Sequence, residues 1–390
     1  MNIVFLFDST YPHYTGGIET WVYNVSERMA DDNEITIFNV ENFRKDDKNG
    51  VYKDINKRVN FISVKNMNHI KPLSYLCKAH ITLLNSNITA NQMVKAFGRF
   101  RKDGEKYYVI ALGTIFAAKA CRKIKEIYPD IVSIVSCRSL HPEVLGESFP
   151  GTLGRLLKIE AKNLSNVDAI WSNGEDTREA LLRKGFDSTV IRNGIDVKRL
   201  ENISPYDFSL MGLEGKRTVV TIGTVQKIKG YYELIDAISI LKEKYNFELH
   251  LVGIGKGNLE RFMNYAKLKG VEDRIHFTGE QRDVIKYAKS ADIIACLSGG
   301  SGYGMAALES MLSYRPVIAW DSPVYRQIIK DNVNGYLVPE GNRDSLADKI
   351  YNNWNEITNN QELTKKAHDS VLRFDWTNVI EDITNELKKF

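Results

Sequence analysis

Short apolar runs alternate with amphipathic stretches along almost the whole chain. Residues 2–7 form a nearly continuous apolar run, and further runs lie at 35–40, 131–135 and 169–171. Runs of this kind are typical of strands buried on both faces of a parallel sheet. A helix is predicted over 19–30, between the first two strands. The first half of the chain therefore predicts a parallel sheet with helices on both faces.

The alternation starts again after a polar stretch. Residues 196–216 contain Pro205, Gly212 and Gly215 and are predicted to form the linker. The elements predicted beyond it are strands at 218–222, 248–252, 275–277, 292–297 and 317–320 and helices at 232–245, 259–269, 283–289 and 305–314. Two such units predict an α/β protein of two facing, doubly wound, Rossmann-like domains, residues 1–197 and 198–374, whose ligands bind outside the carboxyl ends of the strands.

The most informative chemistry lies around a glycine-rich loop that follows an apolar run. The loop reads Gly299-Gly300-Ser301-Gly302-Tyr303-Gly304, and Glu309 lies five residues beyond it on the next helix. Backbone N–H groups at a helix N-terminus can hold a phosphate. A carboxylate one turn into the helix only accepts hydrogen bonds, which suits a pair of ribose hydroxyls. Together they predict a nucleotide or nucleotide-sugar ligand.

Composition narrows the protein class. The chain has 390 residues, of which 43% are hydrophobic and 26% charged, as in globular proteins of two domains. No apolar stretch reaches the roughly 18–20 residues that span a bilayer. The chain starts directly with a strand at Met1, without a basic leader, so no signal peptide is predicted. The four cysteines are scattered, which indicates neither a metal site nor a disulfide framework and favours the reducing cytoplasm.

One region is strongly basic. Residues 65–125 contain twelve Lys or Arg against two acids, a net charge of +10. Such a block can attract phosphorylated substrates or an anionic membrane, which places the protein in the cytoplasm or at the inner face of the membrane. Solvated faces of ordinary helices explain the block equally well. Nucleic acid is not expected as a partner, because no recognised binding module is visible and the pI is only about 8.6.

The order and spacing of several motifs resemble one known family over nearly the whole length. The chain resembles the retaining glycosyltransferases of family four, which have the two-domain GT-B fold. The motifs are Gly16-Gly17-Ile18-Glu19, Ile191-Arg192-Asn193-Gly194-Ile195-Asp196, the loop from Ile222-Gly223 to Lys229-Gly230, Leu251-Val252-Gly253-Ile254-Gly255, Phe277-Thr278-Gly279, Ser301 to Glu309, Pro316-Val317-Ile318-Ala319 and Asn334-Gly335-Tyr336-Leu337-Val338. Residues 375–390 resemble the family's terminal helix, which crosses back to the first domain.

The resemblance implies a reaction and a set of partners. The donor is a sugar carried on a nucleoside diphosphate, and the acceptor is a hydroxyl, which a lipid can carry. Anomeric configuration is retained, the nucleotide sugar is substrate rather than cofactor, and no metal is required. By analogy alone, a role in bacterial surface polysaccharide or glycoconjugate synthesis is expected.

The resemblance also assigns roles to individual residues. Lys229 neutralises the leaving diphosphate, Glu309 binds the ribose, and His141 lies near the transferred sugar, with Arg138 as the alternative cation. Lys229, Glu309 and His141 are the expected catalytic residues. The expected donor-binding residues are Gly16, Gly17, Gly223, Thr224, Lys227, Lys229, Gly300, Ser301, Gly302, Tyr303, Gly304, Met305 and Glu309.

Two departures from the family pattern keep alternatives open. Ser301 stands where the family usually has Glu, and Thr224 stands where it usually has an Arg that pairs with the diphosphate. A non-catalytic sugar-nucleotide-binding subunit is therefore one alternative. A dinucleotide-dependent oxidoreductase is another, since Gly253 and Gly255 follow a strand, although its fingerprint needs a small residue where this chain has Asn258.

Overall fold

The computed structural model describes residues 1–7, 17–40, 57–64, 78–138, 142, 151–299 and 304–390. The chain divides into two compact units. Unit 1 comprises Met1–Gly194 with Trp376–Phe390, and unit 2 comprises Ile195–Asp375. The first boundary between the units follows residue 194, three residues before the predicted boundary at 197. The second follows residue 375, one residue after the predicted boundary at 374. None of the described helices is long and apolar enough to cross a membrane.

Unit 1 contains a seven-stranded parallel sheet in the order β3-β2-β1-β4-β5-β6-β7. Its strands are β1 (Asn2–Phe7), β2 (Glu34–Val40), β3 (Val59–Val64), β4 (Tyr107–Leu112), β5 (Val132–Cys137), β6 (Ala169–Ser172) and β7 (Thr189–Val190). The parallel α/β prediction is confirmed. The predicted strand list lacked β3, whose sequence mixes polar and apolar residues because it is an edge strand, and β4, whose six residues are all buried.

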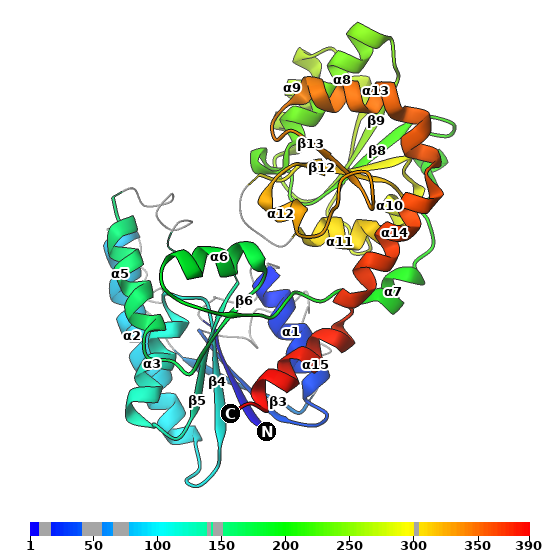
Figure 1. The fold of residues 1–390 in the computed structure, drawn as a ribbon. Helices are drawn as coiled ribbons and strands as arrows, with labels where there is room; N and C mark the ends of the chain where they lie inside the picture. The colour runs from blue at the N-terminus through cyan, green and yellow to red at the C-terminus, as the bar shows by residue number, and fades with distance from the viewer. Residues whose placement is uncertain (8–16, 41–56, 65–77, 139–141, 143–150, 300–303) are drawn as a thin grey trace. The chain divides into compact units, whose positions relative to one another are not determined.

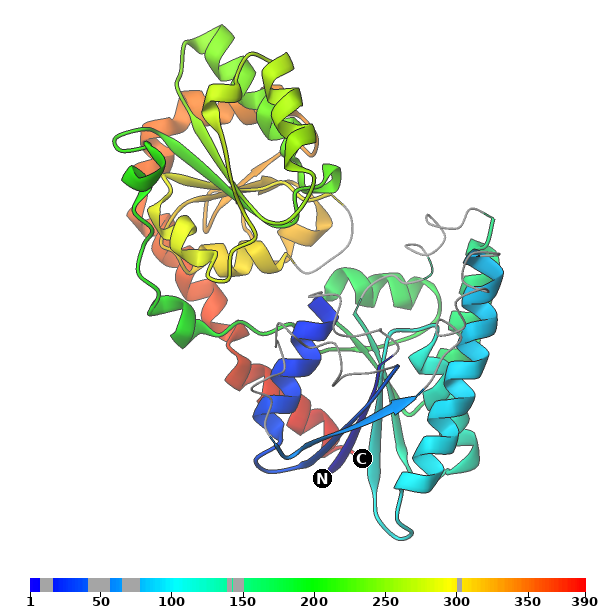
Figure 2. The same ribbon diagram turned by 180° about the vertical axis from the view of Figure 1, so that it is seen from behind.

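Helices cover both faces of this sheet, in two separate layers. The helices are α1 (Gly17–Met29), α2 (Lys78–Phe100), α3 (Ala117–Ile127), α5 (Leu153–Leu164), α6 (Glu175–Arg183) and α15 (Trp376–Leu387). α1 and α15 lie side by side on one face, as Figures 1 and 2 both show, and pack into one core cluster. α2, α3 and the end of α5 pack into the cluster on the other face.

Unit 2 contains a six-stranded parallel sheet in the order β10-β9-β8-β11-β12-β13. Its strands are β8 (Thr218–Ile222), β9 (His250–Ile254), β10 (Ile275–Gly279), β11 (Ile293–Cys296), β12 (Val317–Trp320) and β13 (Tyr336–Val338). The α-helices are α7 (Val197–Glu201), α8 (Tyr231–Tyr245), α9 (Leu259–Leu268), α10 (Ile285–Ser290), α11 (Met305–Met311), α12 (Pro323–Arg326), α13 (Arg343–Asn359) and α14 (Gln361–Val371). A single apolar cluster fills this unit.

The predicted linker at 196–216 is instead part of unit 2. It contains α7 and a short 3-10 helix over Phe208–Met211. Leu200, Phe208 and Leu213 from this stretch are buried in the core of unit 2. The prediction was wrong because this stretch forms two short helices whose apolar side chains are buried, rather than an unstructured connection. Gly212 adopts φ 69° at the end of the 3-10 helix.

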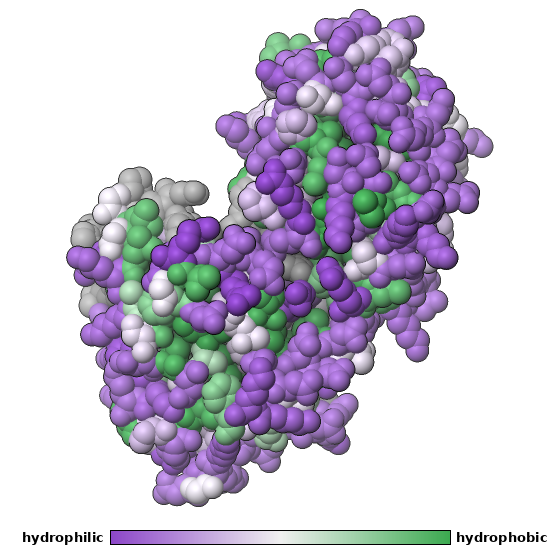
Figure 3. Space-filling view, in the orientation of Figure 1, coloured by the Kyte–Doolittle hydropathy of each residue, from purple (hydrophilic) through white to green (hydrophobic). Residues whose placement is uncertain are grey.

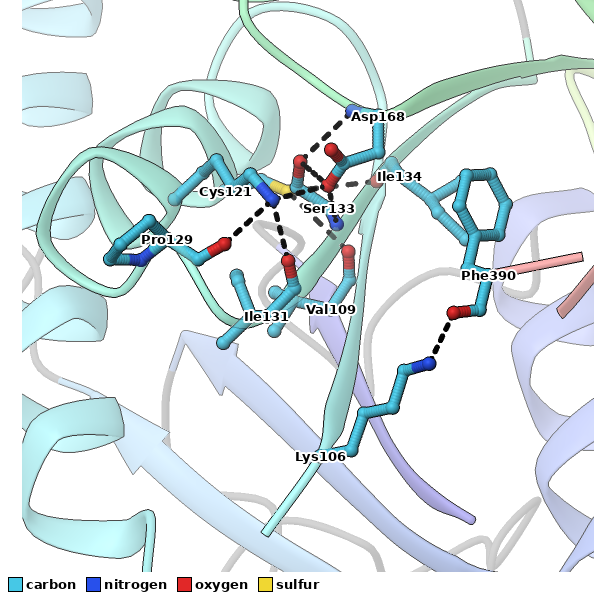
Figure 4. A network of polar contacts seen from close by, with 10 residues as sticks. Lys106, Val109, Cys121, Pro129, Ile131, Ser133, Ile134, Asp168 and Phe390 are labelled. Atoms are coloured by element: carbon cyan, nitrogen blue, oxygen red, sulfur yellow. Dashed lines mark hydrogen bonds and ion pairs between the residues drawn. The ribbon is translucent and has the colours of Figure 1, made fainter. Parts of the chain in front are cut away.

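An aspartate fastens two neighbouring strands at the amino edge of each sheet. In unit 1, Asp168 accepts hydrogen bonds from the N–H and the hydroxyl of Ser133, each at 2.8 Å (Figure 4). It also forms an ion pair with Lys125 at 2.8 Å. Burial raises the pKa of Asp168, but the hydrogen bonds from Lys125 and Ser133 outweigh it and hold the pKa below its ordinary value. In unit 2, Asp292 accepts in the same way from the N–H and the hydroxyl of Thr218.

The two sheets differ where their strand order reverses. In unit 1, β1 and β4 pair over their full length, from Asn2–Tyr107 to Phe7–Leu112. In unit 2, the register between β8 and β11 covers only Val219–Ile293 and Val220–Ile294. These strands are thus fastened at their amino ends and unpaired at their carboxyl ends. The loops that follow β8 and β11 therefore leave the sheet at this point of the carboxyl edge.

The two chain segments that connect the units are paired with each other. The N–H of Ile195 donates to the carbonyl of Phe374 at 2.8 Å, and Ile195 also forms a parallel bridge with Asp375. The side chain of Asp196 caps α7 by accepting from the N–H of Arg199. Gly194 lies so close to the indole of Trp376 that a Cβ atom there would be 2.5 Å from Cε3. The Asn-Gly-Ile-Asp motif therefore has a structural function at the crossing.

We expect Gly194→Ala to lower the free energy of unfolding by about 1–3 kcal/mol, because the added methyl group overlaps the buried Trp376 ring. Gly154→Ala is the matched control, since a Cβ at Gly154, near the start of α5, meets no atom within 4 Å. Chemical denaturation of both variants measures the difference. Equal stability of the two variants would contradict the close packing of Gly194 on Trp376.

Candidate functional site

The candidate site lies at the carboxyl edge of unit 2, between β8 and β11. Strand order reverses here, since β8 continues to β9 on one side and β11 continues to β12 on the other. Ligands of open α/β sheets bind at such a reversal. The loop after β8 and the loop after β11 leave the sheet here, and both were predicted to bind the donor.

Two close contacts hold these loops together. The N–H of Gly299, in the loop after β11, donates to the carbonyl of Ile228 in the loop after β8, at 2.9 Å. Gly230 has φ 75°, and a Cβ there would overlap the carbonyl of Leu297. Only glycine combines this backbone conformation with so close an approach. The position of Lys229, next to Gly230, is therefore fixed by backbone packing.

Lys229 provides the cation of the site. Its side chain is partly buried, and its stem lies against Gly223, where a Cβ would be 3.7 Å from both Cδ and Cε. Burial lowers the pKa of the ammonium group, and the neighbouring Cys296 opposes this change. The described residues offer Lys229 no ion pair or side-chain hydrogen bond. A partly desolvated ammonium group without a partner is ready to bind an anion.

Thr224 and Lys227 are the other predicted polar residues of the first loop. Both side chains are exposed. The hydroxyl of Tyr231 donates to the carbonyl of Gly223 at 3.2 Å and holds the start of the loop against α8. Sequence analysis did not single out this tyrosine, because nothing in its spacing separates it from an ordinary core residue.

Glu309 provides the anion of the site. It lies on α11 beside the buried Leu308 and Ser310 and is itself mostly buried. Burial raises the pKa of its carboxyl group to about 7, and the charge of Arg199 opposes this rise. No ion pair or hydrogen bond to its carboxylate is found among the described residues. Burying an unpaired carboxyl group is unfavourable, so this arrangement is typical of a ligand-binding residue.

The start of α11 completes the described part of the site. Gly304 adopts φ 63°, and its carbonyl accepts from the N–H groups of Ala307 and Leu308. The N–H groups of the first turn, beginning with Met305, have no acceptor within the helix. Upstream of the loop, the Tyr325 hydroxyl accepts from the N–H of Ser298 at 3.2 Å. Sequence analysis missed this contact as well, since it joins residues 27 positions apart.

The remaining predicted residues fall outside this edge or outside the described structure. Gly16, His141, Gly300, Ser301, Gly302 and Tyr303 lie outside the described residues. Gly17 is the first residue of α1. Arg138 is buried, stacks over Trp21 at 4.3 Å and donates to the carbonyl of Ile191 and to the side chain of Asn193. Its guanidinium group therefore holds the end of unit 1's sheet together.

The glycines that motivated the oxidoreductase alternative have packing functions. A Cβ at Gly253 would lie 2.6 Å from the Phe277 ring, and one at Gly255 would overlap the carbonyl of Gly223. Asn258 caps α9 by accepting from the N–H of Arg261 at 3.1 Å. The backbone at Gly255 is thus occupied by the neighbouring loop rather than open to a pyrophosphate.

The geometry supports one kind of ligand. Lys229 provides a cation in the loop after β8, and Glu309 provides a carboxyl group on α11, which follows the loop after β11. Helical N–H groups from Gly304 onward add hydrogen-bond donors for phosphate. The site can therefore bind a molecule with a diphosphate and a pair of hydroxyl groups.

Comparison with known proteins agrees with this chemistry. Residues 207–369, almost all of unit 2, match the family model described as glycosyl transferases group 1. The phosphatidyl-myo-inositol mannosyltransferase of Mycobacterium leprae is 28% identical over 204 residues, 51% of this chain and 53% of that protein, so the match spans about half of the relative. An uncharacterized glycosyltransferase of Methanocaldococcus jannaschii is 25% identical over 365 residues, 92% of this chain and 90% of that protein.

Solved structures show the same fold. The structure of Anabaena HepE in complex with UDP superposes on this chain with a TM-score of 0.77 at 17% sequence identity. The superposition covers 100% of both chains. Sucrose-phosphate synthase of Thermosynechococcus elongatus gives a TM-score of 0.77 at 17% identity, covering 100% of this chain and 99% of that one. The chain thus has the two-domain GT-B architecture. The family match and the sequence relatives support a glycosyltransferase.

We expect the stability of the protein to depend on pH through Glu309. Between its ordinary pKa of 4.5 and the folded value of about 7, Glu309 binds a proton only in the folded state. Unfolding releases that proton, so the free energy of unfolding falls as pH rises through this window. Glu309→Gln should remove this fall and make the variant more stable than the wild type at pH 8, by roughly 1–3 kcal/mol.

Chemical denaturation at pH 5 and pH 8 measures this effect. Glu340→Gln is the control, because Glu340 is exposed on the same edge of the sheet and its loss removes the same charge. Identical pH profiles for the wild type and Glu309→Gln would show that the Glu309 carboxyl group is not desolvated.

Proposed function

We propose that the chain is a retaining glycosyltransferase that moves a hexose from a nucleoside-diphosphate donor to a hydroxyl acceptor. The observation that carries the proposal is the pair of unpartnered groups at the β8–β11 edge. Lys229 and Glu309 are both mostly desolvated, and neither satisfies the other, since no ion pair joins them. A ligand that supplies a diphosphate and a ribose satisfies both at once.

In the proposed reaction, unit 2 binds the donor. The Glu309 carboxylate accepts hydrogen bonds from the two ribose hydroxyls, and the Lys229 ammonium group contacts the diphosphate. When the bond between the anomeric carbon and the phosphate oxygen breaks, negative charge grows on that oxygen. Lys229 stabilises this charge in a partly desolvated setting, where electrostatic stabilisation is strongest.

The new bond forms between the anomeric carbon and the acceptor oxygen, on the face that the leaving group vacates. The acceptor proton passes to the departing phosphate oxygen, so the products are a glycoside with retained configuration and a nucleoside diphosphate. The residues of this chain bind and orient the donor and supply no covalent nucleophile. We propose that neither a cofactor nor a metal ion takes part, so turnover should persist in EDTA.

Two of the similar proteins support a choice of substrates to test. One relative is named as a mannosyltransferase that acts on phosphatidyl-myo-inositol, and the structural neighbour HepE binds UDP. We propose a nucleoside-diphosphate hexose as donor and a hydroxyl-bearing acceptor, lipid-linked or soluble, in glycoconjugate synthesis at the cytoplasmic side of the membrane. GDP-mannose and UDP-glucose are therefore the first donors to test.

The test is release of nucleoside diphosphate from a panel of nucleotide sugars, with and without hydroxyl acceptors. Acceptor-dependent release of nucleotide, together with an α- or β-linkage that matches the donor's, supports the proposal. Tight nucleotide binding without release across the panel would overturn it.

We expect Lys229→Ala to lower kcat/KM by about 10²–10³, because it removes the cation that faces the departing phosphate. Lys227→Ala is the matched control, since this lysine is exposed in the same loop and lies two residues away. Steady-state nucleotide release measures both variants. Equal losses in the two variants would show that Lys229 contributes only general charge.

A second function, donor binding without transfer, is favoured by one observation. Thr224 is exposed and uncharged. It follows Gly223, at the position where the family that this chain resembles usually has an arginine. Thr224→Arg should then tighten nucleoside diphosphate binding by about tenfold, since a charged hydrogen bond is worth about 1.5–3 kcal/mol. Isothermal titration measures the affinity. If turnover appears only in Thr224→Arg, the natural chain is a binding subunit.

A further inference from the structure

The two helix layers of unit 1 carry opposite charge. On one face of the sheet, α2, α3 and α5 together contain ten Lys or Arg and two Glu, and α6, which packs on the same face through Leu181, adds three acids and two Arg. On the other face, α1 and α15 contain five acids and one Arg. We call the first layer the basic face. The sequence placed positive charge in residues 65–125, but the contribution of α5 becomes visible only when the helices are packed together.

The two glutamates do little to neutralise the basic face. Glu160 is 2% exposed and pairs with Lys184, which lies outside the three helices, at 2.8 Å. Glu126 pairs with Arg122, one turn away on α3. On α3, Lys125 pairs with Asp168 at the start of β6. Lys95, Arg99, Lys119, Lys123, Arg155, Lys158 and Lys162 have no acidic partner among the described residues.

Cations from α3 and α5 instead crowd together. Burial lowers the pKa of Lys119, and the positive charges of Lys123, Arg122 and Lys162 lower it further. Lys119 and Lys123 donate to the neutral side-chain amides of Asn87 and Asn91 on α2. Neutral amides accept the hydrogen bonds of the two lysines but do not neutralise their positive charges. The basic face thus holds mutually repelling cations that an external anion would stabilise.

A groove of about 420 Å³ runs along the edge of the basic face, between edge strand β3 and α2. The groove is lined by the apolar residues Ile62, Val64, Ala96 and Phe100. Lys95 and Arg99 add two positive charges to the lining. Lys95 and Arg99 are exposed and one helical turn apart. Neither has an ion-pair or hydrogen-bond partner in the described part of the chain.

Apolar and cationic side chains also alternate over α5. Leu153 is 41% exposed, and Arg155 and Lys158 are exposed beside it. In Figure 3 apolar and hydrophilic side chains lie next to one another over this helix. Helices that combine cations with exposed apolar residues are typical of membrane surfaces.

We propose that the basic face docks unit 1 on an anionic lipid surface, with a lipid phosphate at Lys95 and Arg99 and the adjoining hydrophobic part of that lipid in the groove. Charge complementarity requires an anionic partner, and the apolar lining selects one whose phosphate is attached to hydrocarbon. A nucleic acid would leave that lining against sugar and phosphate. The inference goes beyond the proposed transfer reaction and does not depend on it.

The test is co-sedimentation of the full chain with phosphatidylcholine vesicles, prepared with and without phosphatidylglycerol. We expect binding only to the anionic vesicles, and we expect salt to weaken it. Lys95→Ala/Arg99→Ala should weaken this binding by about tenfold or more. Lys95→Arg/Arg99→Lys keeps the charge and should bind like the wild type.

The matched control is Lys267→Ala/Lys365→Ala, which removes the same charge from exposed helix lysines of unit 2. It should bind vesicles like the wild type. Equal weakening in both double variants, or equal binding to neutral and anionic vesicles, would overturn the proposal. So would binding of glycerol phosphate or a DNA oligonucleotide without binding of vesicles. Nucleotide binding, followed by thermal shift on the same samples, should stay unchanged in every variant and separates this test from that of the transfer reaction.

Discussion

The site depends on one constraint, the partial pairing of β8 with β11. Asp292 fastens the amino ends of these strands through Thr218, while the register ends after Val220–Ile294. Beyond the paired residues, the two loops contact each other through Gly299 and Ile228 and through Gly230 and Leu297. The corresponding pair in unit 1 is bonded throughout. The aspartate clamp occurs in both sheets and the short register only in unit 2, which indicates that the clamp supports the sheet independently of the site.

The groups at that edge lower stability in the absence of a ligand. Glu309 and Lys229 are both removed from water without a partner, which is costly for each. The surrounding backbone tolerates this because Gly230 and Gly299 fix the two loops against each other and because the apolar core beneath is continuous. Stability lost at the site is thus offset by packing elsewhere, as is common where a protein must bind a charged ligand.

The sequence predicted the α/β class and most strands of unit 2, because a buried parallel strand is a continuous apolar run. The family resemblance singled out Lys229, and the spacing after the glycine-rich loop singled out Glu309, and the structure places these two residues on the two elements that follow β8 and β11. The sequence did not predict the contacts of Tyr325 and Tyr231, because these depend on which strands become neighbours. It also mistook 196–216 for a linker, since short helices that bury few residues, among them Val197, Leu200, Phe208 and Leu213, leave little periodicity. Tertiary neighbours, absent from any local window, account for each miss.

Helix α15 gives the chain an unusual order of assembly. Unit 1 is completed by Trp376, Val379, Ile383 and Leu387, which leave the ribosome only after the whole of unit 2. Until then, the face of the sheet beside α1 stays exposed, while unit 2, being continuous in sequence, can already fold. The half of the protein that is synthesised first is thus the half that matures last. Truncation after residue 375 would leave a complete unit 2 attached to a unit 1 that chaperones and proteases still recognise as incomplete.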